Sequence, residues 1–354
     1  MTRPERRNAV PTIQAVDLFC GVGGLTHGLI RGGITVVAGV DVDPACRHPY
    51  ETNNDAAFFE EDIKGLQADR LKPLFGKGAL TMMAGCAPCQ PFSTYSRSGR
   101  KQRGGDDWEL VGSFGRLVRE VQPDFVTMEN VPQVEQHPVF RDFLASLVGY
   151  QVTWKVIECS TLGVPQTRKR LVLLGSRHGA IDLRMPRLKS TKTVRETIGE
   201  LPSLRAGESD GRDSLHVACR LSEINLRRIK ASRPGGTWRD WKPSLRAACH
   251  RKETGDTYPS VYGRMEWDKP APTITTQCFG YGNGRFGHPD QHRAITLREA
   301  AMLQTFPRNY EFVPKGAAVK FSQLGRLIGN AVPVRLGEVI ARSFVAHAAS
   351  IAET

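Results

Sequence analysis

A cysteine and a glutamate stand at the ends of two short apolar runs in this chain. Cys89, in a Pro-Cys-Gln tripeptide, comes shortly after the run at residues 79–84, and Glu129 directly follows the run at 125–128. A strand that stops at this point presents the following side chains at the rim of a sheet, where ligands bind. A thiol and a carboxyl group at neighbouring strand ends predict one active site that works through a covalent intermediate.

Basic side chains precede a third apolar run, at residues 171–175. The thiolate is the reactive form of a cysteine, and nearby arginines lower a thiol pKa that starts near about 8.5. Alternate residues of an extended segment point the same way, so Gln166, Arg168 and Arg170 are expected to share one face. Three long polar side chains on one face predict a clamp for an anion or for the edge of a base. A solvated run of charge is the alternative.

Cys89 has two other interpretations, as a buried apolar side chain or as half of a redox or metal-binding pair with Cys86. A structural zinc site would need a second such pair at a suitable spacing, and the sequence has none, so no metal is expected. Cys86 still offers a second thiol near Cys89, which raises the question of an inactivating disulfide, although buried packing is its expected role. The eight cysteines are scattered, unlike a secreted disulfide framework, and are expected to be thiols.

A glycine-rich turn follows the first apolar run. Residues 17–25 read Asp-Leu-Phe-Cys-Gly-Val-Gly-Gly-Leu, which predicts a strand, a turn and a helix that let the backbone approach a nucleotide-like ligand closely. The full three-glycine dinucleotide fingerprint is absent, which argues against a nicotinamide cofactor. Asp41 closes the second apolar run, where its carboxylate could accept the hydroxyl groups of a ribose. Asp43, before Pro44, is typical of a helix N-cap.

Short apolar runs alternate with helix-like patterns from about residue 16 to residue 175. This alternation predicts an α/β fold with a largely parallel sheet and helices on both faces. After about residue 185, prolines interrupt short Arg- and Lys-rich pieces, which predicts a second, smaller and less regular domain. Helix-like periodicity returns at residues 297–304 and 333–349. The basic, glycine-containing stretch at 96–107 is consistent with a mobile lid over phosphates or with an ordinary surface loop.

Composition restricts the class of protein. The 354-residue chain has a net charge of +13 and a sequence pI of about 9.6, which suits a polyanionic partner or an incidentally basic enzyme. No apolar stretch approaches the roughly eighteen residues that cross a bilayer, and the basic N-terminus lacks a signal-peptide core. A cytoplasmic protein without membrane contact is therefore expected.

Five ordered motifs resemble those of the DNA (cytosine-5) methyltransferase family. They are Asp-Leu-Phe-x-Gly-x-Gly-Gly from residue 17, Pro-Cys-Gln around residue 89, Glu-Asn-Val from residue 129, Gln-x-Arg-x-Arg from residue 166 and Gly-Asn-Ala-Val-Pro at 329–333. The resemblance covers nearly the whole chain except roughly residues 180–255. It implies an S-adenosylmethionine-dependent methyltransferase with a Rossmann-like mixed sheet. Residues 1–186 and 314–354 would form a discontinuous catalytic domain, and residues 187–313 a smaller, irregular target-recognition domain with its hinge.

The resemblance assigns a pocket for S-adenosylmethionine to distant parts of the chain. Asp41 would hold the ribose, and Val42 would pack on the adenine. The last helix is expected to pack beside the first strand, so that the end of the chain completes the pocket. The other residues implied to line it are Phe19, Gly21, Gly23, Gly24 and Leu25 of the turn, Asp62 and Ile63 at the adenine edge, and Asn330 and Val332 near the end of the chain.

The same resemblance implies a reaction at carbon 5 of cytosine, which is a poor nucleophile. Cys89 would add to carbon 6, and Glu129 would contact ring nitrogen 3 and the exocyclic amine. Arg170 would hold the carbonyl oxygen, while Arg168 would support a closed loop and its backbone. Because the target atom cannot be reached within a stacked duplex, the cytosine would be flipped out of double-stranded DNA.

Residues 187–292 mix basic and aromatic side chains and would grip the DNA. The protein is expected to act as a monomer, associated with the nucleoid when it is bound to DNA. The methylated sequence cannot be read from this region, because specificity depends on which side chains reach the groove edges and on how the duplex deforms. Whether a cognate restriction endonuclease or another defence system accompanies the protein is left open.

Three alternatives stand beside this interpretation. A transfer RNA cytosine-5 methyltransferase shares the motifs, but Pro-Phe-Ser at residues 91–93 and the sizeable variable region favour DNA. A catalytically silent DNA-binding relative conflicts with the presence of all four candidate catalytic residues. A nicotinamide-dependent oxidoreductase would use Cys86 and Cys89 as a redox pair.

Overall fold

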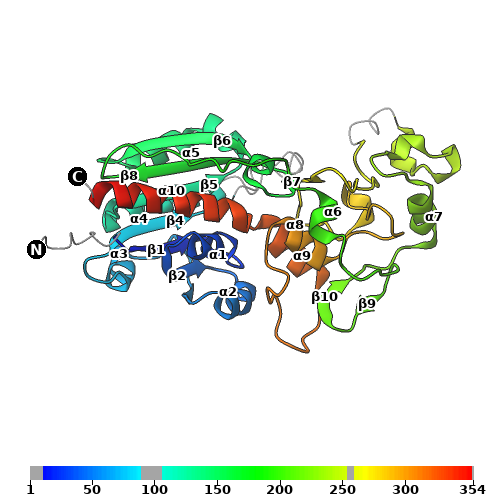
Figure 1. Cartoon of the computed structure of the whole chain (residues 1–354), viewed down its shortest axis with the longest axis horizontal. Coiled ribbons are helices and arrows are strands. Elements are labelled where there is room, and N and C mark those ends of the chain that lie inside the picture. Colours follow the sequence, from blue (N-terminus) through cyan, green and yellow to red (C-terminus); the bar gives the residue numbers. More distant parts are fainter. Residues whose placement is uncertain (1–10, 89–105, 253–258, 353–354) are drawn as a thin grey trace, which may run out of the picture. The chain divides into compact units, whose positions relative to one another are not determined.

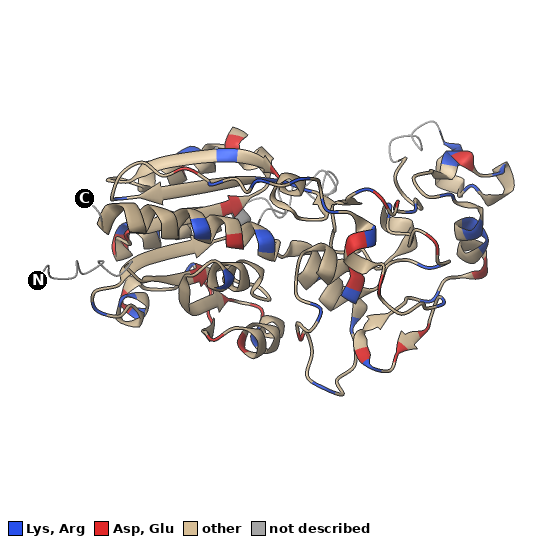
Figure 2. Cartoon of the chain, viewed as in Figure 1, with Lys and Arg blue, Asp and Glu red and all other residues tan. Residues whose placement is uncertain are grey.

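The computed structural model describes residues 11–88, 106–252 and 259–352 (Figure 1). The chain divides into two compact units. The first comprises Met1–Ile157, Lys169–Arg187 and Val334–Thr354, and the second comprises Glu158–Arg168 and Leu188–Pro333. Both units contain Lys and Arg residues as well as Asp and Glu residues (Figure 2). In the part of the chain that the structure describes, no helix is both long and apolar enough to span a bilayer.

The units differ from the expected domain ranges at two places. Residues 158–168 and 314–333 belong to the second unit, whereas the prediction assigned both to the catalytic domain. The boundary between Arg187 and Leu188 is adjacent to the expected one. Because the C-terminal helix belongs to the first unit, that unit is discontinuous along the chain.

A seven-stranded sheet forms the centre of the first unit, with the strand order β3-β2-β1-β4-β5-β8-β6. β1 pairs in parallel with β2 and β4, β2 with β3, and β4 with β5, whereas β8 runs antiparallel to β5. The sheet is therefore mixed, with a parallel majority. The strands are β1 (Ile13–Leu18), β2 (Thr35–Asp41), β3 (Ala57–Glu60), β4 (Leu80–Gly85), β5 (Phe125–Asn130), β6 (Gln151–Glu158) and β8 (Lys169–Ser176).

Helices cover both faces of this sheet. The helices of the first unit are α1 (Gly24–Arg31), α2 (Arg47–Asn53), α3 (Ala68–Leu71), α4 (Asp106–Val121), α5 (Pro138–Ser146) and α10 (Val334–Ala352). Val126 of β5 shares a buried cluster with Phe114 of α4 and Phe143 of α5, whereas Phe125 packs against Phe344 of α10 with ring centroids 5.2 Å apart. Successive side chains of a strand point to opposite faces, so α4 and α5 cover one face and α10 the other (Figure 1).

The C-terminal helix packs mainly against α1, the helix that follows the first strand. Glycines allow the close approach: a Cβ added at Gly28 would lie 2.3 Å from the carbonyl oxygen of Val334 and 2.7 Å from the Cα of Gly337. The first and last helices of the unit are thus in backbone contact. The sequence predicts that the last helix packs beside the first strand. In the structure, α10 packs mainly against α1, the helix that follows this strand.

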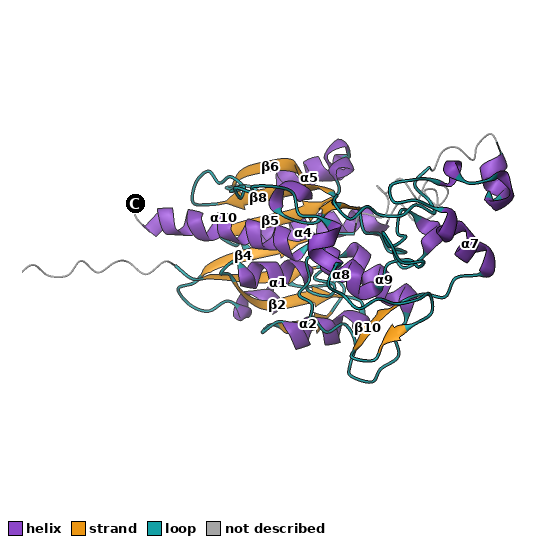
Figure 3. Cartoon of the chain, turned by 45° about the vertical axis from the view of Figure 1, so that its right-hand side comes forward, coloured by secondary structure: helices purple, strands orange, loops and turns teal. Residues whose placement is uncertain are grey.

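The second unit is built of short elements joined by long irregular segments (Figure 3). A buried cluster holds it together around α7, with Ile229, Trp238, Trp241 and Tyr281 at its centre. Its elements are α6 (Val194–Ile198), α7 (Glu223–Ala231), α8 (Leu297–Leu303), α9 (Phe321–Asn330) and the short strands β7 (Gln166–Thr167), β9 (Ser209–Asp210), β10 (Asp213–Val217) and β11 (Ala271–Pro272).

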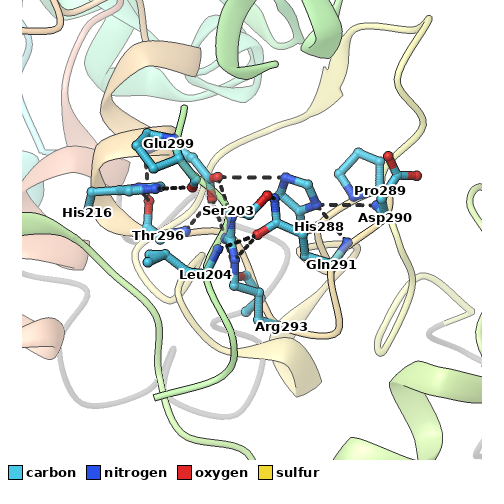
Figure 4. A network of polar contacts seen from close by, with 12 residues as sticks. Ser203, Leu204, His216, His288, Pro289, Asp290, Gln291, Arg293, Thr296 and Glu299 are labelled. Atoms are coloured by element: carbon cyan, nitrogen blue, oxygen red, sulfur yellow. Dashed lines mark hydrogen bonds and ion pairs between the residues drawn. The ribbon is translucent and has the colours of Figure 1, made fainter. Parts of the chain in front are cut away.

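A buried ion pair organises the start of α8 (Figure 4). Both terminal nitrogens of Arg293 donate to Glu299, at 2.7 and 2.8 Å, and both side chains are fully buried. Glu299 also accepts from the backbone N–H of Thr296, whose hydroxyl caps the helix and contacts His216. Nδ1 of His288 accepts from two backbone N–H groups, which leaves its other nitrogen facing Glu299 at 3.8 Å. These polar groups form one network of hydrogen bonds around the start of α8.

Candidate active site

The motif residues of the first unit gather at the carboxyl edge of the sheet. The parallel strands β1, β2, β4 and β5 all end there, because parallel neighbours share one direction. Leu18 lies opposite Gly85, and the N–H of Cys86 donates to the Leu18 carbonyl at 3.4 Å. The strand order reverses between β1 and β4, and such a switch point opens a crevice in which α/β proteins bind ligands.

Cys89 lies outside the described residues, as do most of the basic stretch that follows it and residues 91–93. The described part of this loop ends at Pro88. Asn130 Nδ2 donates to the carbonyl of Ala87 at 3.2 Å, and Asn130 Oδ1 accepts from the N–H of Val131 at 2.8 Å. Asn130, which is 1% exposed, therefore ties the start of the loop to the end of β5. The sequence motif contains this asparagine, but only its glutamate was assigned a role.

Glu129 is buried at the end of β5 and has a partner at each carboxylate oxygen. Nε of Arg170 lies 2.7 Å from Oε1 in an ion pair whose N–H does not meet hydrogen-bond geometry. The thiol of Cys86 donates to Oε2, with Sγ also 2.7 Å away. Only 2% of the Glu129 side chain is exposed, against 13% for Arg170. These two contacts restrict the orientation of the carboxylate at the end of β5.

The direction of β8 explains why Arg170 reaches Glu129. β8 is antiparallel to β5, with Glu129 opposite Val172 and Asn130 opposite Leu171. The first residues of β8 consequently meet the last residues of β5 at the carboxyl edge. A parallel β8 would have placed its beginning, and Arg170, at the opposite edge.

Gln166 and Arg168 do not share the position of Arg170. Gln166 lies in β7, which pairs with β11 in a separate two-stranded sheet, and its amide contacts Gln304, Leu303 and Ile274. The guanidinium of Arg168 donates to the carbonyls of Ile274, Gly329 and Ala331. Both side chains are buried in the second unit. Gln166 and Arg168 therefore do not form the expected three-residue clamp with Arg170, and of the three only Arg170 contacts Glu129 among the described residues.

The glycine-rich turn is shaped by backbone conformations that suit glycine. Phe19, Gly21 and Gly23 all have positive φ, and Gly23 directly precedes α1. Asp41, the last residue of β2, accepts from the N–H of Gly21 at 2.8 Å and from the N–H of Asp43 at 2.9 Å. Burial raises the pKa of Asp41. Asp43 caps the turn at residues 44–46 by accepting from the N–H of Ala45, as the sequence predicts.

The remaining residues assigned to the cofactor pocket differ in exposure. Val42 is 67% exposed, unusually so for an apolar side chain, while Ile63 is buried in the core cluster next to α4. Asp62 is exposed, and its side chain accepts from the N–H of Lys64 at 2.9 Å, which forms a turn after β3. Leu25 is buried, and Gly24 begins α1.

Asn330 and Val332 belong to the second unit, Asn330 as the exposed last residue of α9 and Val332 as a buried side chain. The carbonyls around them receive hydrogen bonds from Arg168 and from Gln304, whose Nε2 donates to Ile328 at 2.9 Å and to Ala331 at 3.3 Å. The buried side chains of Arg168 and Gln304 thus hold the end of α9. These contacts were not predicted from the sequence.

A buried pair of polar side chains next to the glycine-rich turn, Asp17 and Thr26, was also not predicted from the sequence. Thr26 donates its hydroxyl to Oδ2 of Asp17 at 2.7 Å, and Oδ1 of Asp17 has no hydrogen-bond partner among the described residues. Burial raises the pKa of Asp17 to about 7, against the effect of the Thr26 hydrogen bond. Burial also raises the pKa of the neighbouring Cys20 thiol, which disfavours its thiolate form.

The turn and the end of β2 fit a nucleoside-containing cofactor. A Cβ added at Gly21 would meet no atom within 4 Å, so open space lies in front of the backbone there. Val42, whose side chain is 67% exposed, directly follows Asp41 in the chain, and an exposed apolar side chain next to a carboxylate residue suits an aromatic base next to a ribose. Among the described residues, no group of three or more His, Cys, Asp or Glu side chains is arranged to hold a metal ion.

Comparisons with known proteins agree with this geometry. A family model described as C-5 cytosine-specific DNA methylase matches residues 13–346. The chain is 53% identical over 335 residues to the Type II methylase M.HgiDII of Herpetosiphon aurantiacus, covering 93% of this chain and 94% of that protein. It is 31% identical to the Type II methyltransferase M1.HphI of Haemophilus parahaemolyticus, covering 93% and 85%. A solved prophage-encoded protein of E. coli has the same fold, with a TM-score of 0.70 at 23% identity over 94% of this chain and 98% of that one.

The chain therefore belongs to the family of C-5 cytosine-specific DNA methylases and is a DNA (cytosine-5-)-methyltransferase. The resemblance carried by the five motifs is confirmed, and so is the prediction of an α/β fold with a mixed sheet and a second, irregular part. The roles of individual site residues remain predictions.

Proposed function

We propose that this enzyme transfers a methyl group to carbon 5 of a cytosine that is flipped out of a specific duplex DNA sequence, through a covalent bond between Cys89 and carbon 6. The observation that supports this most is the buried Glu129 carboxylate at the strand rim, paired with Arg170 at 2.7 Å and next to the start of the Pro-Cys loop. A ring that is to be attacked by a thiolate needs such a group at its polar edge.

Each side chain has a defined task in this proposal. Cys89 adds to carbon 6, and after carbon 5 has taken the methyl group a base removes the carbon-5 proton, so that Cys89 leaves. The covalent bond divides one difficult step into easier ones. Glu129 contacts ring nitrogen 3 and the exocyclic amine, and so stabilises the protonated ring. Arg170 keeps Glu129 in place and holds the carbonyl oxygen of the base. Arg168 acts indirectly, because its guanidinium supports the backbone at Ile274 and at residues 329–331.

S-adenosylmethionine, when bound, supplies the methyl group as an activated sulfonium. We assign its ribose to Asp41 and its adenine to the exposed side of Val42, with Asp62 and Ile63 at the adenine edge. The turn would approach the rest of the molecule with its backbone, where Gly21 leaves open space. The residues assigned to the turn are Phe19, Gly21, Gly23, Gly24 and Leu25, and Asn330 and Val332 are assigned to complete the pocket.

We assign DNA recognition to the second unit, where basic residues recur along the chain (Figure 2) between aromatic ones. Arg228, Arg239 and Arg246 stack on Trp238, Trp241 or Tyr262, which keeps their charge at the surface of the aromatic cluster. The relatives named Type II methylase and Type II methyltransferase support a role in restriction-modification, with a cognate endonuclease as partner. We propose a monomer that acts in the cytoplasm and on the nucleoid.

The substrate can be tested with purified protein and a radiolabelled methyl donor. The proposal predicts methyl incorporation into duplex DNA and none into transfer RNA. Bisulfite sequencing of DNA from cells that express the protein would then show 5-methylcytosine within one recurring sequence. Incorporation into transfer RNA alone would establish the RNA methyltransferase alternative, and incorporation into neither would contradict the proposal.

A further inference from the structure

The thiol of Cys86 occupies an unusual position, at the carboxylate of the buried Glu129. Its Sγ donates to Oε2 at 2.7 Å, while Arg170 occupies the side of Oε1. Cys86 is half-buried and comes directly after β4. None of the five sequence motifs requires a thiol at this position, because the Pro-Cys-Gln motif begins two residues later.

The two oxygens of Glu129 are held with different strength. Arg170 carries a full positive charge and attracts Oε1 as an ion, although its N–H does not meet hydrogen-bond geometry. A thiol is a weak neutral donor. Oε2 is consequently the oxygen that Glu129 can more easily share with, or yield to, a donor group of a bound base.

Both partners of this hydrogen bond are attached to rigid backbone. The N–H of Cys86 donates to Leu18 at the end of β1, and Glu129 pairs in register with Val172 of β8. Asn130 holds the carbonyl of Ala87, one residue after the thiol. The geometry between the thiol and the carboxylate is therefore maintained by the ends of β1, β4 and β5.

We propose that Cys86 is a positioning residue for Glu129: its thiol holds Oε2 and orients the carboxyl group before the target base arrives. This inference rests on the proposed function, since it takes Glu129 to be the group that contacts the base. It also assigns the thiol a task other than the disulfide with Cys89 that the sequence suggests. Without the thiol, Oε2 would lose this donor in a buried site, and the carboxyl group would lose one of its two restraints.

Infrared spectroscopy tests the hydrogen bond itself and needs no turnover. The difference spectrum of wild-type protein minus Cys86→Ser isolates the S–H stretch of Cys86. We expect a band at lower frequency than that of a thiol without an acceptor, and a shift to higher frequency when the same difference is taken in a Glu129→Gln background. A band at the position of a thiol without an acceptor, unchanged by Glu129→Gln, would overturn the inference whether or not the protein methylates DNA.

Steady-state kinetics test the coupling to catalysis. Cys86→Ala is expected to lower kcat/KM for duplex DNA about three- to tenfold, the effect of one lost hydrogen bond, with KM for the methyl donor unchanged. Cys86→Ser retains a donor and should recover most of the loss. Cys219→Ala, which removes a half-buried thiol from the second unit, is the matched control and should equal the wild type.

The outcomes separate the inference from the proposed function. If the wild type methylates duplex DNA and Cys86→Ala matches it in both parameters, the positioning role is wrong and the proposed function stands. If Cys86→Ala is less active but Cys86→Ser is equally impaired, the loss comes from packing and the inference is also overturned. If the wild type transfers no methyl group to DNA, the proposed function fails, while the infrared result still decides whether the thiol holds Glu129.

Discussion

Oε1 of Glu129 lies 2.7 Å from Nε of Arg170, and this contact joins the end of one strand to the beginning of another. It exists because β8 runs antiparallel to β5, whereas β1, β2, β3, β4 and β5 are joined by parallel pairings. The reversed strand delivers a cation to the edge at which the parallel strands present the turn, the Pro-Cys loop and Glu129. The contact between Glu129 and Arg170 thus depends on the antiparallel pairing of β5 with β8.

Arg170→Ala should destabilise the first unit strongly. Removal of one partner of a buried ion pair leaves an uncompensated charge and typically costs about 3–5 kcal/mol, and here the carboxylate is 2% exposed. Urea unfolding at neutral pH measures the change. Arg170→Lys keeps a positive charge near Oε1 and should lose less. A free energy of unfolding for Arg170→Ala within about 0.5 kcal/mol of the wild type would show that the pair does not hold the strand ends.

Gly28→Ala should weaken the contact between the first and last helices. The added Cβ would lie 2.3 Å from the Val334 carbonyl oxygen and 2.7 Å from the Cα of Gly337, and backbone on both helices would have to shift. Overpacking of this kind costs about 1–3 kcal/mol. Gly112→Ala in α4 is the matched control, because its Cβ meets nothing within 4 Å and alanine favours a helix by about 0.5–1 kcal/mol. Equal melting temperatures for the two variants would refute the close-packing argument.

The stability of the protein should depend on pH through Asp17. Burial raises the pKa of Asp17 to about 7 in the folded protein, whereas an aspartate in an unfolded chain titrates near about 3.9. The folded state therefore binds this proton more tightly, and the stabilisation is complete below about pH 4 and lost as the pH rises through about 7. The difference corresponds to about 4 kcal/mol.

Asp17→Asn removes this titration and keeps an oxygen that can accept from Thr26. Urea unfolding of both proteins at pH 5 and pH 8 should show that the wild type loses stability relative to the variant as the pH rises. A difference between the two proteins that stays constant across this range would mean that Asp17 is ionised in the folded state.

Glu299→Gln should destabilise the second unit and reduce its sensitivity to acid. Burial opposes ionisation of Glu299, but the hydrogen bonds and charge of Arg293 outweigh it and lower the pKa below its ordinary value of 4.5. The stabilisation is present above that ordinary value and is lost as the pH falls through the lower folded pKa. Chemical unfolding followed by tryptophan fluorescence at pH 7 and pH 4 should show a loss of about 3–5 kcal/mol at pH 7 and a smaller difference at pH 4. Equal differences at both pH values would contradict this assignment.

Much of the first unit follows from the sequence because its strands are short apolar runs that end in polar or glycine-rich motifs. The turn before α1, the cap at Asp43 and the placement of Glu129 at a strand end are all visible in this pattern. Strand direction is not, since an apolar run reads the same in either orientation. The antiparallel β8, and with it the Arg170 contact, required the structure.

The clamp at residues 166–170 was predicted from alternation along one extended segment. In the structure, β7 ends at Thr167 and β8 begins at Lys169, so the segment is divided between two sheets. Alternation has no meaning across such a break, and Gln166 and Arg168 are directed to backbone carbonyls of the second unit instead. The partners of Cys86 and Gln304 could not be predicted from the sequence either, because they are tertiary contacts between segments that are distant along the chain.

The covalent intermediate is tested most directly with duplex DNA that carries 5-fluorocytosine at the methylated position, because fluorine at carbon 5 prevents release of the enzyme after methyl transfer. With the methyl donor present, the wild-type protein should form a stable complex whose crosslinked peptide contains modified Cys89, and Cys89→Ala should form none. A complex attached at another residue, or methyl transfer to ordinary duplex DNA by Cys89→Ala, would contradict the central role of this cysteine.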